Sequence, residues 1–507
     1  MSRNVTFVAD VRTAQIAVLE VTQDYAVADG STANTLRARV TDAFGNALAG
    51  QTVSVTAGNG ATVSPTVITG PDGTVEISVT SQTAGVSAVT ATINNSTASQ
   101  NVMFIADVRT AKIADLVVIK DDSVADGAMA NMLRARVTDA FGNALAGQTV
   151  SVMAGNGATT APTVTTQPDG TVEISATSQT AGISTVTATI NNSSLSRNVM
   201  FVADVRTAQI ADLVVIKDGS VADGSTANML RVRVTDAFGN ALGGQTVSVL
   251  ADNGVTTAPT VITEPDGTVE ISVTSQTAGV SAVTATINSS SQSQNVTFIA
   301  DVSTAKIAEL EVIRDNAVAD GSTANTLQVK VTDANGNTLA GQTVSVTAGN
   351  SATVAPTVTT QPDGTVEIIV TSQTAGTSTV TASINSSSQS RNVTFVADVR
   401  TAQIADLVVI KDGSEADGAT ANTLRARVTD AFGNALAGQT VSVLADNGAT
   451  VAPTVTTQPD GTVEISVTSQ TAGISAVTAS INNSSLSRNV TFIADVSTAK
   501  IADLVVI

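Results

Sequence analysis

The stretch NTLRARVTDAFGNALAGQTVSV, residues 34–55, decides the fold of this chain. Residues 36–41 alternate apolar and polar side chains, and residues 52–56 do so again. A period of two predicts strands that turn one face toward a core. The segment between them is rich in Asp, Asn and Gly, which favour turns. We therefore predict a strand, a turn and a second strand, which together form a hairpin.

This stretch returns four more times at a constant interval. Its Thr-Asp-Ala motif begins at Thr41, and the later copies begin at Thr138, Thr235, Thr332 and Thr429, each 97 residues after the last. A unit of about 100 residues can bury its own core, whereas the shorter units of a solenoid cannot. The 507-residue chain is therefore predicted to hold five self-sufficient domains in a row.

The period also sets the expected boundaries. We number the modules 1 to 5 and place them at residues 11–107, 108–204, 205–301, 302–398 and 399–495. Residues 1–10 repeat the end of a module, so we expect there the last strand of a truncated preceding module. Residues 496–507 repeat the start of a module, so we expect there the first strand of a truncated following module. Because both ends cut through the pattern, we expect a fragment. The absence of a signal peptide or transmembrane span is therefore explained by the fragment and does not indicate a cytosolic location.

Seven runs in module 1 are interpreted as strands, with turn signals between them. They lie near residues 16–21, 36–41, 52–56, 66–69, 74–80, 89–93 and 101–106. The first run is apolar on both faces, which favours a strand that is covered on both sides or that changes sheets along its length. No window shows a helical period. The pattern is typical of an all-β immunoglobulin-like sandwich of two sheets, with a core of Val, Ile, Leu, Ala and one or two Phe.

The composition excludes most catalytic and metal chemistry. With no His and no Cys, the chain lacks the residues of Ser-His-Asp and Cys-His sites and of the usual zinc, haem and iron–sulfur sites. The formal net charge of −19 argues against nucleic acid or an anionic membrane as a partner, because both attract clustered Lys and Arg. We expect no catalytic residue, no cofactor, no metal and no enzymatic activity; a glycosidase with paired carboxylates is the distant alternative.

The segments that join the modules contain no Gly, no Pro and no Ser-rich run. Flexible linkers need such residues over a longer span. We therefore predict a stiff rod with limited bending. If each sandwich adds roughly 30–45 Å, the five modules reach on the order of 150–220 Å.

Two acidic loops recur in every module and are candidate calcium sites. The first contains Ala-Asp-Gly and the second Pro-Asp-Gly-Thr. Their aspartates are Asp29, Asp126, Asp223, Asp320 and Asp417 in the first loop and Asp72, Asp169, Asp266, Asp363 and Asp460 in the second. Calcium between modules would stiffen the rod. However, Asp before Gly is an ordinary turn residue that bonds its own backbone, and neither loop has the alternating ligands of an EF-hand, so we favour turn chemistry.

Two further features are candidate sites with simpler alternatives. Arg37 and Arg39, with Glu76 on a facing strand, could form a recognition patch, although cross-strand ion pairing on a solvated sheet is favoured. The loop at residues 333–337 is rich in oxygen ligands, but it occurs once in five copies and is interpreted as drift. Because Asn335 replaces a Phe there, we expect module 4 to be the least well packed near this turn.

Two covalent modifications are also considered. Triplets such as Asn95-Ser96-Thr97 are acceptors only in a glycosylating host, and Ser/Thr-rich turns create them by chance. A lysine isopeptide crosslink would need an inward Lys at one module position. Lys112, Lys306 and Lys500 lie at junctions and are Gln in other copies, so we discount this crosslink.

The order of the motifs resembles a known family. Along almost the whole chain, Ala-Asp-Gly is followed by Asn-x-Leu-x-Ala-x-Val-Thr-Asp-Ala-x-Gly-Asn, Gly-Gln-x-Val, Asn-Gly-Ala, Pro-Asp-Gly-Thr-Val-Glu, Thr-Ser-x-Thr-Ala-Gly and Val-Thr-Ala. This string is similar to the bacterial immunoglobulin-like (group 1) domains of the invasin and intimin adhesins. The resemblance implies Gram-negative surface proteins with an outer-membrane anchor and an adhesive domain at the far tip. That tip contains Cys and Trp, which this chain lacks, so no receptor-binding residue transfers.

The sequence therefore predicts a stalk or spacer segment of such an adhesin, which holds a binding domain away from the cell surface. We expect an extracellular location, an outer-membrane anchor in a region outside this chain, and the neighbouring modules as the direct partners. A host or matrix receptor would be reached through a tip domain, also outside this chain. The alternative is a repeated low-affinity binding module, for a host or matrix ligand or for the same stalk on another cell, whose weak contacts act collectively.

Overall fold

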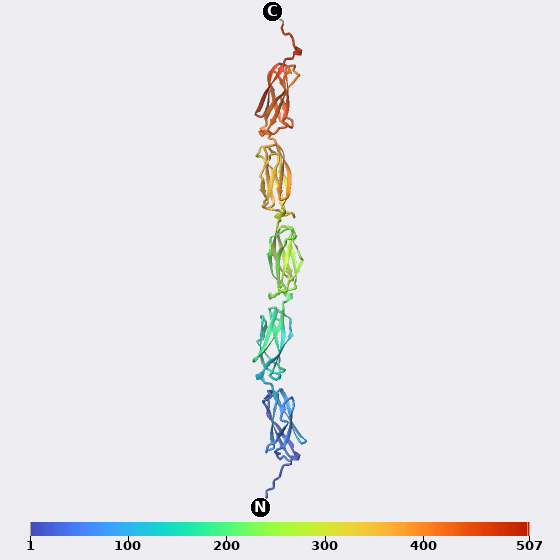
Figure 1. Ribbon diagram of the computed structural model, residues 1–507, viewed down its shortest axis with the longest axis vertical. Helices are drawn as coiled ribbons and strands as arrows, with labels where there is room; N and C mark the ends of the chain where they lie inside the picture. The colour runs from blue at the N-terminus through green and yellow to red at the C-terminus, as the bar shows by residue number, and fades with distance from the viewer. Residues whose placement is uncertain (1, 504, 506–507) are drawn as a thin grey trace.

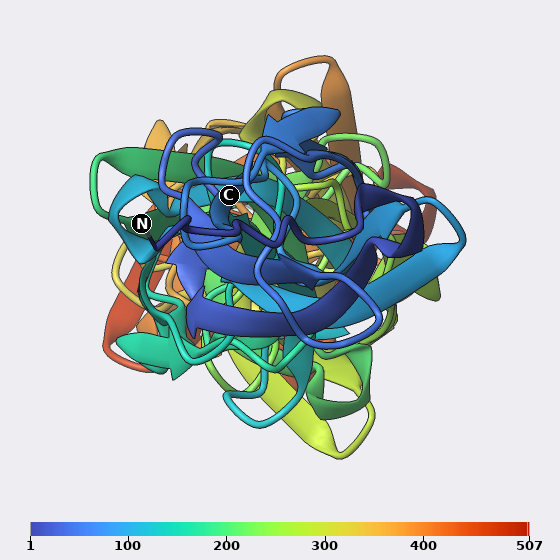
Figure 2. The ribbon, with the colours of Figure 1, turned by 90° about the horizontal axis from the view of Figure 1, so that it is seen from below.

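The computed structural model describes residues 2–503 and 505. The five modules lie end to end along one axis, and the two ends of the chain are at opposite ends of the array (Figure 1). Viewed along that axis, the modules share a common centre and their sheets point in different directions (Figure 2). The predicted linear array of all-β sandwiches is confirmed.

Each module contains a four-stranded and a five-stranded sheet. In module 1 the strands are β1 (Gln15–Gln23), β2 (Ala26–Val27), β3 (Asn34–Thr41), β4 (Thr52–Ala57), β5 (Thr62–Val63), β6 (Thr66–Ile68), β7 (Thr74–Thr80), β8 (Gly85–Ile93) and β9 (Ser96–Ile105). The strand orders are β1-β3-β7-β5 and β2-β9-β8-β4-β6. The neighbours are antiparallel except β2 and β9, which are parallel.

The same arrangement recurs in the later modules. In module 3 the strands are β19 (Gln209–Lys217), β20 (Ser220–Val221), β21 (Asn228–Thr235), β22 (Thr246–Ala251), β23 (Thr256–Thr257), β24 (Thr260–Ile262), β25 (Thr268–Thr274), β26 (Gly279–Ile287) and β27 (Ser290–Ile299). Strands β10–β18 lie within residues 112–202, β28–β36 within 306–396 and β37–β45 within 403–493. A short 3-10 helix begins each module: η1 (Val11–Thr13), η2 (Val108–Thr110), η3 (Val205–Thr207), η4 (Val302–Thr304) and η5 (Val399–Thr401). A sixth, η6 (Val496–Thr498), follows module 5.

The number of strands differs from the prediction. Each module has nine strands, not seven, because β2 and β5 were missed. Each of these is only two residues long. Two residues are too few to show an alternating pattern, so the signal that revealed the other strands is missing.

The predicted hairpin at residues 34–55 is wrong. Strand β3 pairs with β1 and β7, whereas β4 pairs with β8 and β6 in the other sheet. The connection at residues 42–51 therefore crosses between the sheets, and Leu48 is buried on the way. Alternation shows which side chains face the core, but two strands that face one core from opposite sheets show the same alternation.

The first strand stays in one sheet, and the chain changes sheets after this strand has ended. Strand β1 stays paired with β3, with register shifts between Ile16 and Val18 and between Val21 and Gln23. The chain then turns at Tyr25, whose φ is 62°, and continues as β2 in the five-stranded sheet. The sheet change was predicted, but cover on both faces was not correct, because Val18 remains exposed.

The core of each module has the predicted composition. In module 1 it contains Leu36, Val40, Ile77 and Phe104 among other buried Val, Ile, Leu and Ala residues. Phe44, the other Phe of the module, is 87% exposed. One Phe per module therefore belongs to the core, and the second must be explained in another way.

The two ends of the array carry no strand. Residues 2–10 and 499–503 have no regular structure beyond η1 and η6, although we expected a last and a first strand there. Strand β9 is held by β8 and β2, and a lone copy of it lacks these hydrogen-bond partners. The rest of the expected C-terminal strand, at 504, 506 and 507, lies outside the described residues. No helix in the described part of the chain is both long and apolar enough to cross a membrane.

Candidate functional site: the junctions between modules

The link between modules 2 and 3 is short and internally bonded. After the last strand of module 2, Asp204 caps η3, and its Oδ1 accepts a hydrogen bond from the Arg206 N–H at 3.0 Å. The Arg206 guanidinium also donates to this carboxylate, at 3.0 Å from Nε and 3.3 Å from Nη2. These bonds, led by that of the guanidinium, lower the pKa of Asp204. The link is therefore a single ordered turn with little freedom to bend.

A buried aspartate ties this link to module 3. Asp236, which is 0% exposed, follows β21 in the Thr-Asp-Ala motif. Its Oδ2 accepts from the Asp204 N–H at 3.1 Å, and its Oδ1 accepts from the N–H groups of Phe238 and Asn240, both at 2.9 Å. Next to it, the Ala237 N–H donates to Thr207 at 3.2 Å. One carboxylate therefore fixes both the link and the turn at residues 236–240.

The side chain of Asn240 reaches back into module 2. Its Oδ1 accepts from the Ala181 N–H at 2.8 Å, and its Nδ2 donates to the Gln179 carbonyl at 2.9 Å and to Asp236 at 2.8 Å. Both ends of the amide are thus used across the boundary between the modules. Two bonds of opposite polarity fix the orientation of one module relative to the next, because a small rotation would break at least one of them.

The exposed Phe of the turn is partly covered in the same place. Phe44, in the first module of the described chain, is 87% exposed, whereas Phe238 is 46% exposed. In module 4 the equivalent residue is Asn335, and its Nδ2 donates to the Ala222 carbonyl in the Ala-Asp-Gly loop of module 3 at 2.8 Å. This side-chain position therefore points toward the preceding module, which explains why the second Phe is outside the core.

The amide contacts recur at the other three junctions. Asn143 bonds Ala84 and Gln82, Asn337 bonds Ala278 and Gln276, and Asn434 bonds Ala375 and Gln373, at 2.8–3.0 Å. In module 1, the first module of the described chain, the Asn46 amide donates to its own Asp42 at 2.9 Å. The junction is thus a site that recurs at all four boundaries between the described modules.

A family model and a curated relative match this chain. The family model for the bacterial Ig-like domain (group 1) matches residues 16–105, 113–202, 210–299, 307–396 and 404–493. The chain belongs to this family. It is also 32% identical, over 547 aligned positions, to the inverse autotransporter adhesin YeeJ of Escherichia coli (strain K12). That alignment covers 99% of this chain but only 23% of YeeJ.

Two solved adhesin structures match parts of the chain. A crystal structure of invasin, described as a bacterial integrin-binding protein, is 23% identical over 75% of this chain and 79% of that one, with a TM-score of 0.36. The D0-D1 domain of intimin is 27% identical over 37% of this chain and 98% of that one, with a TM-score of 0.18. The resemblance to bacterial Ig-like (group 1) domains is confirmed by the family match, and the chain is an adhesin-related repeat region.

In these Ig-like modules the first acidic loop bonds to itself. In module 3, Asp223 Oδ1 accepts from the N–H groups of Ser225 and Thr226 at 2.7 and 2.6 Å, and Oδ2 accepts from the Thr226 hydroxyl at 2.6 Å. The Thr226 hydroxyl is the main cause that holds the pKa of Asp223 well below its usual range. These are the contacts of an ordinary turn. Among residues 2–503 and 505, no group of three or more acidic residues is placed to hold a metal ion.

The second acidic loop has the same chemistry. Asp266 Oδ1 accepts from the Thr268 N–H at 2.9 Å and from its hydroxyl at 2.7 Å, which lowers the pKa of Asp266. The next residue, Gly267, has a φ of +77°, and a Cβ there would lie 2.6 Å from the Val234 carbonyl. Gly267 is therefore required by the close contact of this loop with the end of β21.

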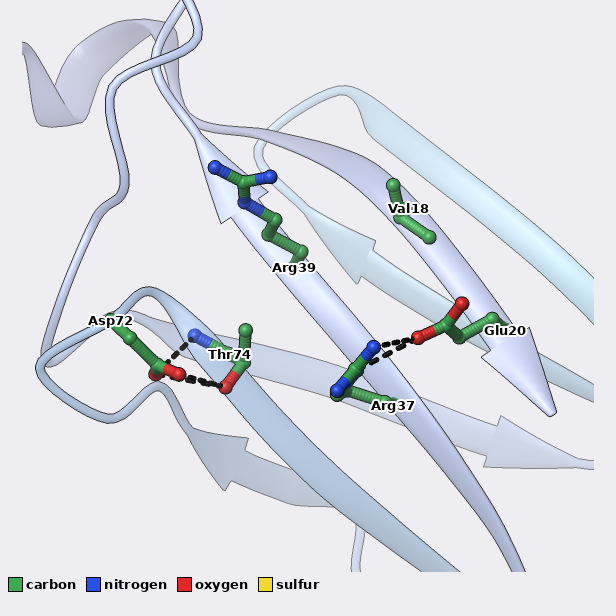
Figure 3. Close-up of a pocket in the computed structure, with 6 residues that line it drawn as sticks. All are labelled: Val18, Glu20, Arg37, Arg39, Asp72 and Thr74. Carbon is green, nitrogen blue, oxygen red and sulfur yellow. Dashed lines mark hydrogen bonds and ion pairs between the residues drawn. The ribbon is translucent and has the colours of Figure 1, made fainter. Parts of the chain in front are cut away.

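The predicted arginine patch lies on the outer face of the four-stranded sheet. Arg37 forms an ion pair with Glu20 on β1, and not with Glu76, although Glu76 is opposite it on β7. Figure 3 shows Arg39 apart from this pair and Asp72 bonded to Thr74. Both members of the pair are about half exposed, so cross-strand pairing describes them, with a different partner from the one predicted.

The remaining candidates have structural contacts. Lys112 and Lys306 donate from Nζ to the carbonyls of Ala140 and Ala334 at 3.3 and 3.2 Å, in the turn of the same module. Lys500 is exposed. In the triplet at residues 95–97, the Ser96 hydroxyl accepts from the N–H of Ile16 at 3.0 Å. Lys112 and Lys306 therefore bond the turn of their own module, and none of the three lysines points inward as a crosslink would need.

Sequence reasoning missed the residues that join the modules. It treated the Gly-Asn pair at the end of the turn as turn chemistry and a module marker. The available signal was that the Asn persists in module 4, as Asn337, although the Phe two residues before it is lost. An Asn needed only for a turn could be replaced by Asp or Gly, so its presence in all five copies suggested a second contact.

Proposed function

We propose that this chain is a stalk segment of a bacterial surface adhesin, which holds a binding domain away from the cell. The observation that carries the proposal is the pair of Asn amide bonds repeated at all four junctions. Together with a three-residue link capped by its own Asp, they favour one orientation between modules. A spacer gains reach from such stiffness, whereas a flexible chain of beads coils back on itself.

The similarity to YeeJ supports the location and the partners that we propose. The relative is named as an inverse autotransporter adhesin, which fits display outside the cell through an outer-membrane anchor beyond this segment. A host or matrix receptor would be contacted by a tip domain, also beyond this segment. Within the segment the partners are the neighbouring modules, and the function is non-enzymatic.

The module boundaries are part of the proposal. We propose that 11–107, 108–204, 205–301, 302–398 and 399–495 are the folding units, with 1–10 and 496–507 as parts of further modules. The five separate core clusters support this division. The module at 205–301, produced alone, should show one cooperative thermal transition. Loss of cooperativity would mean that the boundaries are misplaced.

Small-angle scattering of the whole chain tests the stalk. We expect a maximum dimension on the order of 150–220 Å, and a value well under about 120 Å would sink the rod. In the fourfold variant Asn143→Ala, Asn240→Ala, Asn337→Ala and Asn434→Ala the distance distribution should become broader and shorter. Asn46→Ala is the matched control, since among the described residues that amide bonds its own Asp42, and this variant should scatter as the unchanged protein does.

Direct binding, repeated five times, is the second candidate. It is favoured by the outer face of the five-stranded sheet, which carries no charged residue on β4, β8 and their counterparts in a chain of net charge −19. In module 1 this face presents Thr52, Ser54 and Thr56 from β4 and Val86, Ala88, Thr90 and Thr92 from β8. Weak contacts there would add through avidity. Binding of the isolated chain to host cells or to itself would support this function over a passive stalk.

A further inference from the structure

The short second strand of each module, which continues from the strand by which the chain enters, is bonded directly to the last strand. In module 3, β20 continues from the first strand, β19, and pairs with the last strand, β27. Ser220 lies opposite Phe298 and Val221 opposite Ile299, and the two strands are parallel. The Ala222 N–H then donates to the Ile299 carbonyl at 2.8 Å. This is the one parallel pairing of the module.

Two polar side chains lengthen this pairing. Asn228, which is 0% exposed, accepts from the Ser220 N–H and donates to the Thr297 carbonyl, both at 2.9 Å. Asp218, just before β20, accepts from the Thr297 N–H at 2.6 Å. A two-residue strand is thereby connected to β27 over a longer span than its own backbone allows. We name Asp218, Asn228 and the β20–β27 pair the terminal clamp.

The terminal clamp is present in every module. The buried amides are those of Asn34, Asn131, Asn228, Asn325 and Asn422, and each is 0% exposed. Each donates to a carbonyl of the last strand at 2.7–3.0 Å. The carboxylates are those of Asp24, Asp121, Asp218, Asp315 and Asp412, and each accepts from an N–H of the last strand at 2.6–2.7 Å. Substitutions elsewhere in the modules have left this set unchanged.

The direction of the strands decides how the clamp responds to a pull along the rod. Tension pulls β19, and through it β20, toward one end of the module, and it pulls the end of β27 toward the other end. Because the two strands are parallel, these opposite pulls slide one strand along the other and load all the bonds between them together. In a hairpin pulled open from its free ends, the bonds would instead be loaded one after another. We propose that each module is a tension-bearing element and that the terminal clamp sets the force at which it unfolds.

Single-molecule pulling of the whole chain tests this proposal. The variant Asn228→Ala changes one module and leaves the other four as internal references in every trace. We expect four equal unfolding events and one weaker event. At a fixed force the altered module should unfold at least about tenfold faster, since forced unfolding follows the unfolding rate and two buried backbone groups lose their partner.

A matched control separates force resistance from ordinary stability. Thr263, which is 4% exposed, also makes two side-chain bonds to backbone, to the Leu242 carbonyl at 2.6 Å and from the Gln245 N–H at 2.9 Å. It lies beside β22 and β24, away from the clamp. Thr263→Val should lower the melting temperature of module 3 but leave five equal unfolding forces.

The outcomes decide between the alternatives. If Asn228→Ala lowers the melting temperature but all five forces stay equal, or if Thr263→Val weakens the event as much, the clamp does not set the force. If Asn228→Ala prevents module 3 from folding, Asp218→Ala replaces it. That variant removes a single exposed hydrogen bond, the one from the Thr297 N–H, and its unfolding force is compared with the other four in the same way. The role of this force resistance in the cell rests on the proposed stalk, but the two tests are separate. Scattering can refute the stiff rod while the pulling result stands, and pulling can refute the clamp while the rod stands.

Discussion

The junction between modules 2 and 3 and that between modules 3 and 4 share a polar frame and differ in the side chains around it. Asp236 and Asp333 accept the same backbone bonds, and Asn240 and Asn337 bond the preceding module alike. At the second junction, however, Ser303 stands where the first has Arg206, and an Asn stands where it has Phe238. The second junction therefore lacks the ion pair between Arg206 and Asp204, and it lacks the half-buried Phe.

The difference teaches which contacts define the junction and which adjust its strength. At the second junction Ser303 donates to Asp301 at 2.6 Å, and Asn335 donates to the Ala222 carbonyl at 2.8 Å. Both substitutions thus replace larger contacts with a single hydrogen bond, while the Asp and Asn frame is unchanged. We infer that the frame sets the orientation between modules and that the Phe and Arg positions tune how firmly it is held. The lower stability expected for module 4 stays a prediction, which single-module melting would test.

The largest effect should follow from breaking the shared frame. Asp236→Ala removes one buried carboxylate that accepts several bonds from the link and the turn. Bonds to a charged group contribute about 1.5–3 kcal/mol each and are not additive, so we expect module 3 to lose at least about 3 kcal/mol. Differential scanning calorimetry of the chain should show one module that melts earlier.

The same change at the other junction is the control for this prediction. Asp333 is also 0% exposed and accepts from the Asp301, Asn335 and Asn337 N–H groups at 2.8–3.1 Å. Asp333→Ala should therefore cost module 4 as much as Asp236→Ala costs module 3. A clearly smaller loss in module 4 would mean that the frame is not equivalent at the two junctions.

A middle-sized effect is expected from exchanging the tuning residue. The exposed fraction of the Phe falls from 87% at Phe44 to 46% at Phe238, which corresponds to about 80 Å² and ~2 kcal/mol of apolar burial. Phe238→Asn should weaken the first junction and Asn335→Phe should strengthen the second. The distribution of distances between spin labels on adjacent modules should become broader in Phe238→Asn and narrower in Asn335→Phe.

Module 1 again supplies the control. Phe44→Asn changes the same turn at a side chain that is 87% exposed in the described chain, so the stability of module 1 should change little. If Phe44→Asn lowers the stability of module 1 by as much as Phe238→Asn lowers the stability of the first junction, the Phe acts within its own turn. The view of the Phe as a contact between modules would then be wrong.

Much of the fold followed from the period and the alternation, because both are local properties of the chain. The five modules, the sandwich and the core could be predicted from residues such as Leu36 and Val40, whose neighbours alternate. The assignment of β3 and β4 to different sheets could not, since alternation carries no information about the partner strand. Strands of two residues, such as β2, also left no pattern to detect.

The site was harder to predict because it joins residues that are far apart and chemically ordinary. Asn240 and Gln179 are 61 residues apart and belong to different modules. Their sequence context, a Gly-Asn turn and a Gln-Thr loop, is common in surface loops. The stiffness of the link could be inferred from the missing Gly and Pro, but the amide that fixes the orientation required the spatial arrangement.

The smallest effect concerns the ion pair, where the two junctions differ most in charge and least in energy. In the folded state the Arg206 guanidinium lowers the pKa of Asp204, and at the second junction the Ser303 hydroxyl lowers that of Asp301. A carboxyl whose folded pKa is lowered stabilises the fold above its unfolded pKa, near 3.9, and this contribution is lost as the pH falls through the folded value. Arg206→Ala should raise the pKa of Asp204, so that the loss begins at higher pH, whereas Arg206→Ser should raise it less because a hydroxyl takes over the bond. Carboxyl-carbon NMR titration at low and high salt measures both, with Arg233→Ala as the control. Since Arg206 is largely exposed, salt should remove most of the difference, and a salt-independent shift would mean that the hydrogen bond, not the charge, holds the link.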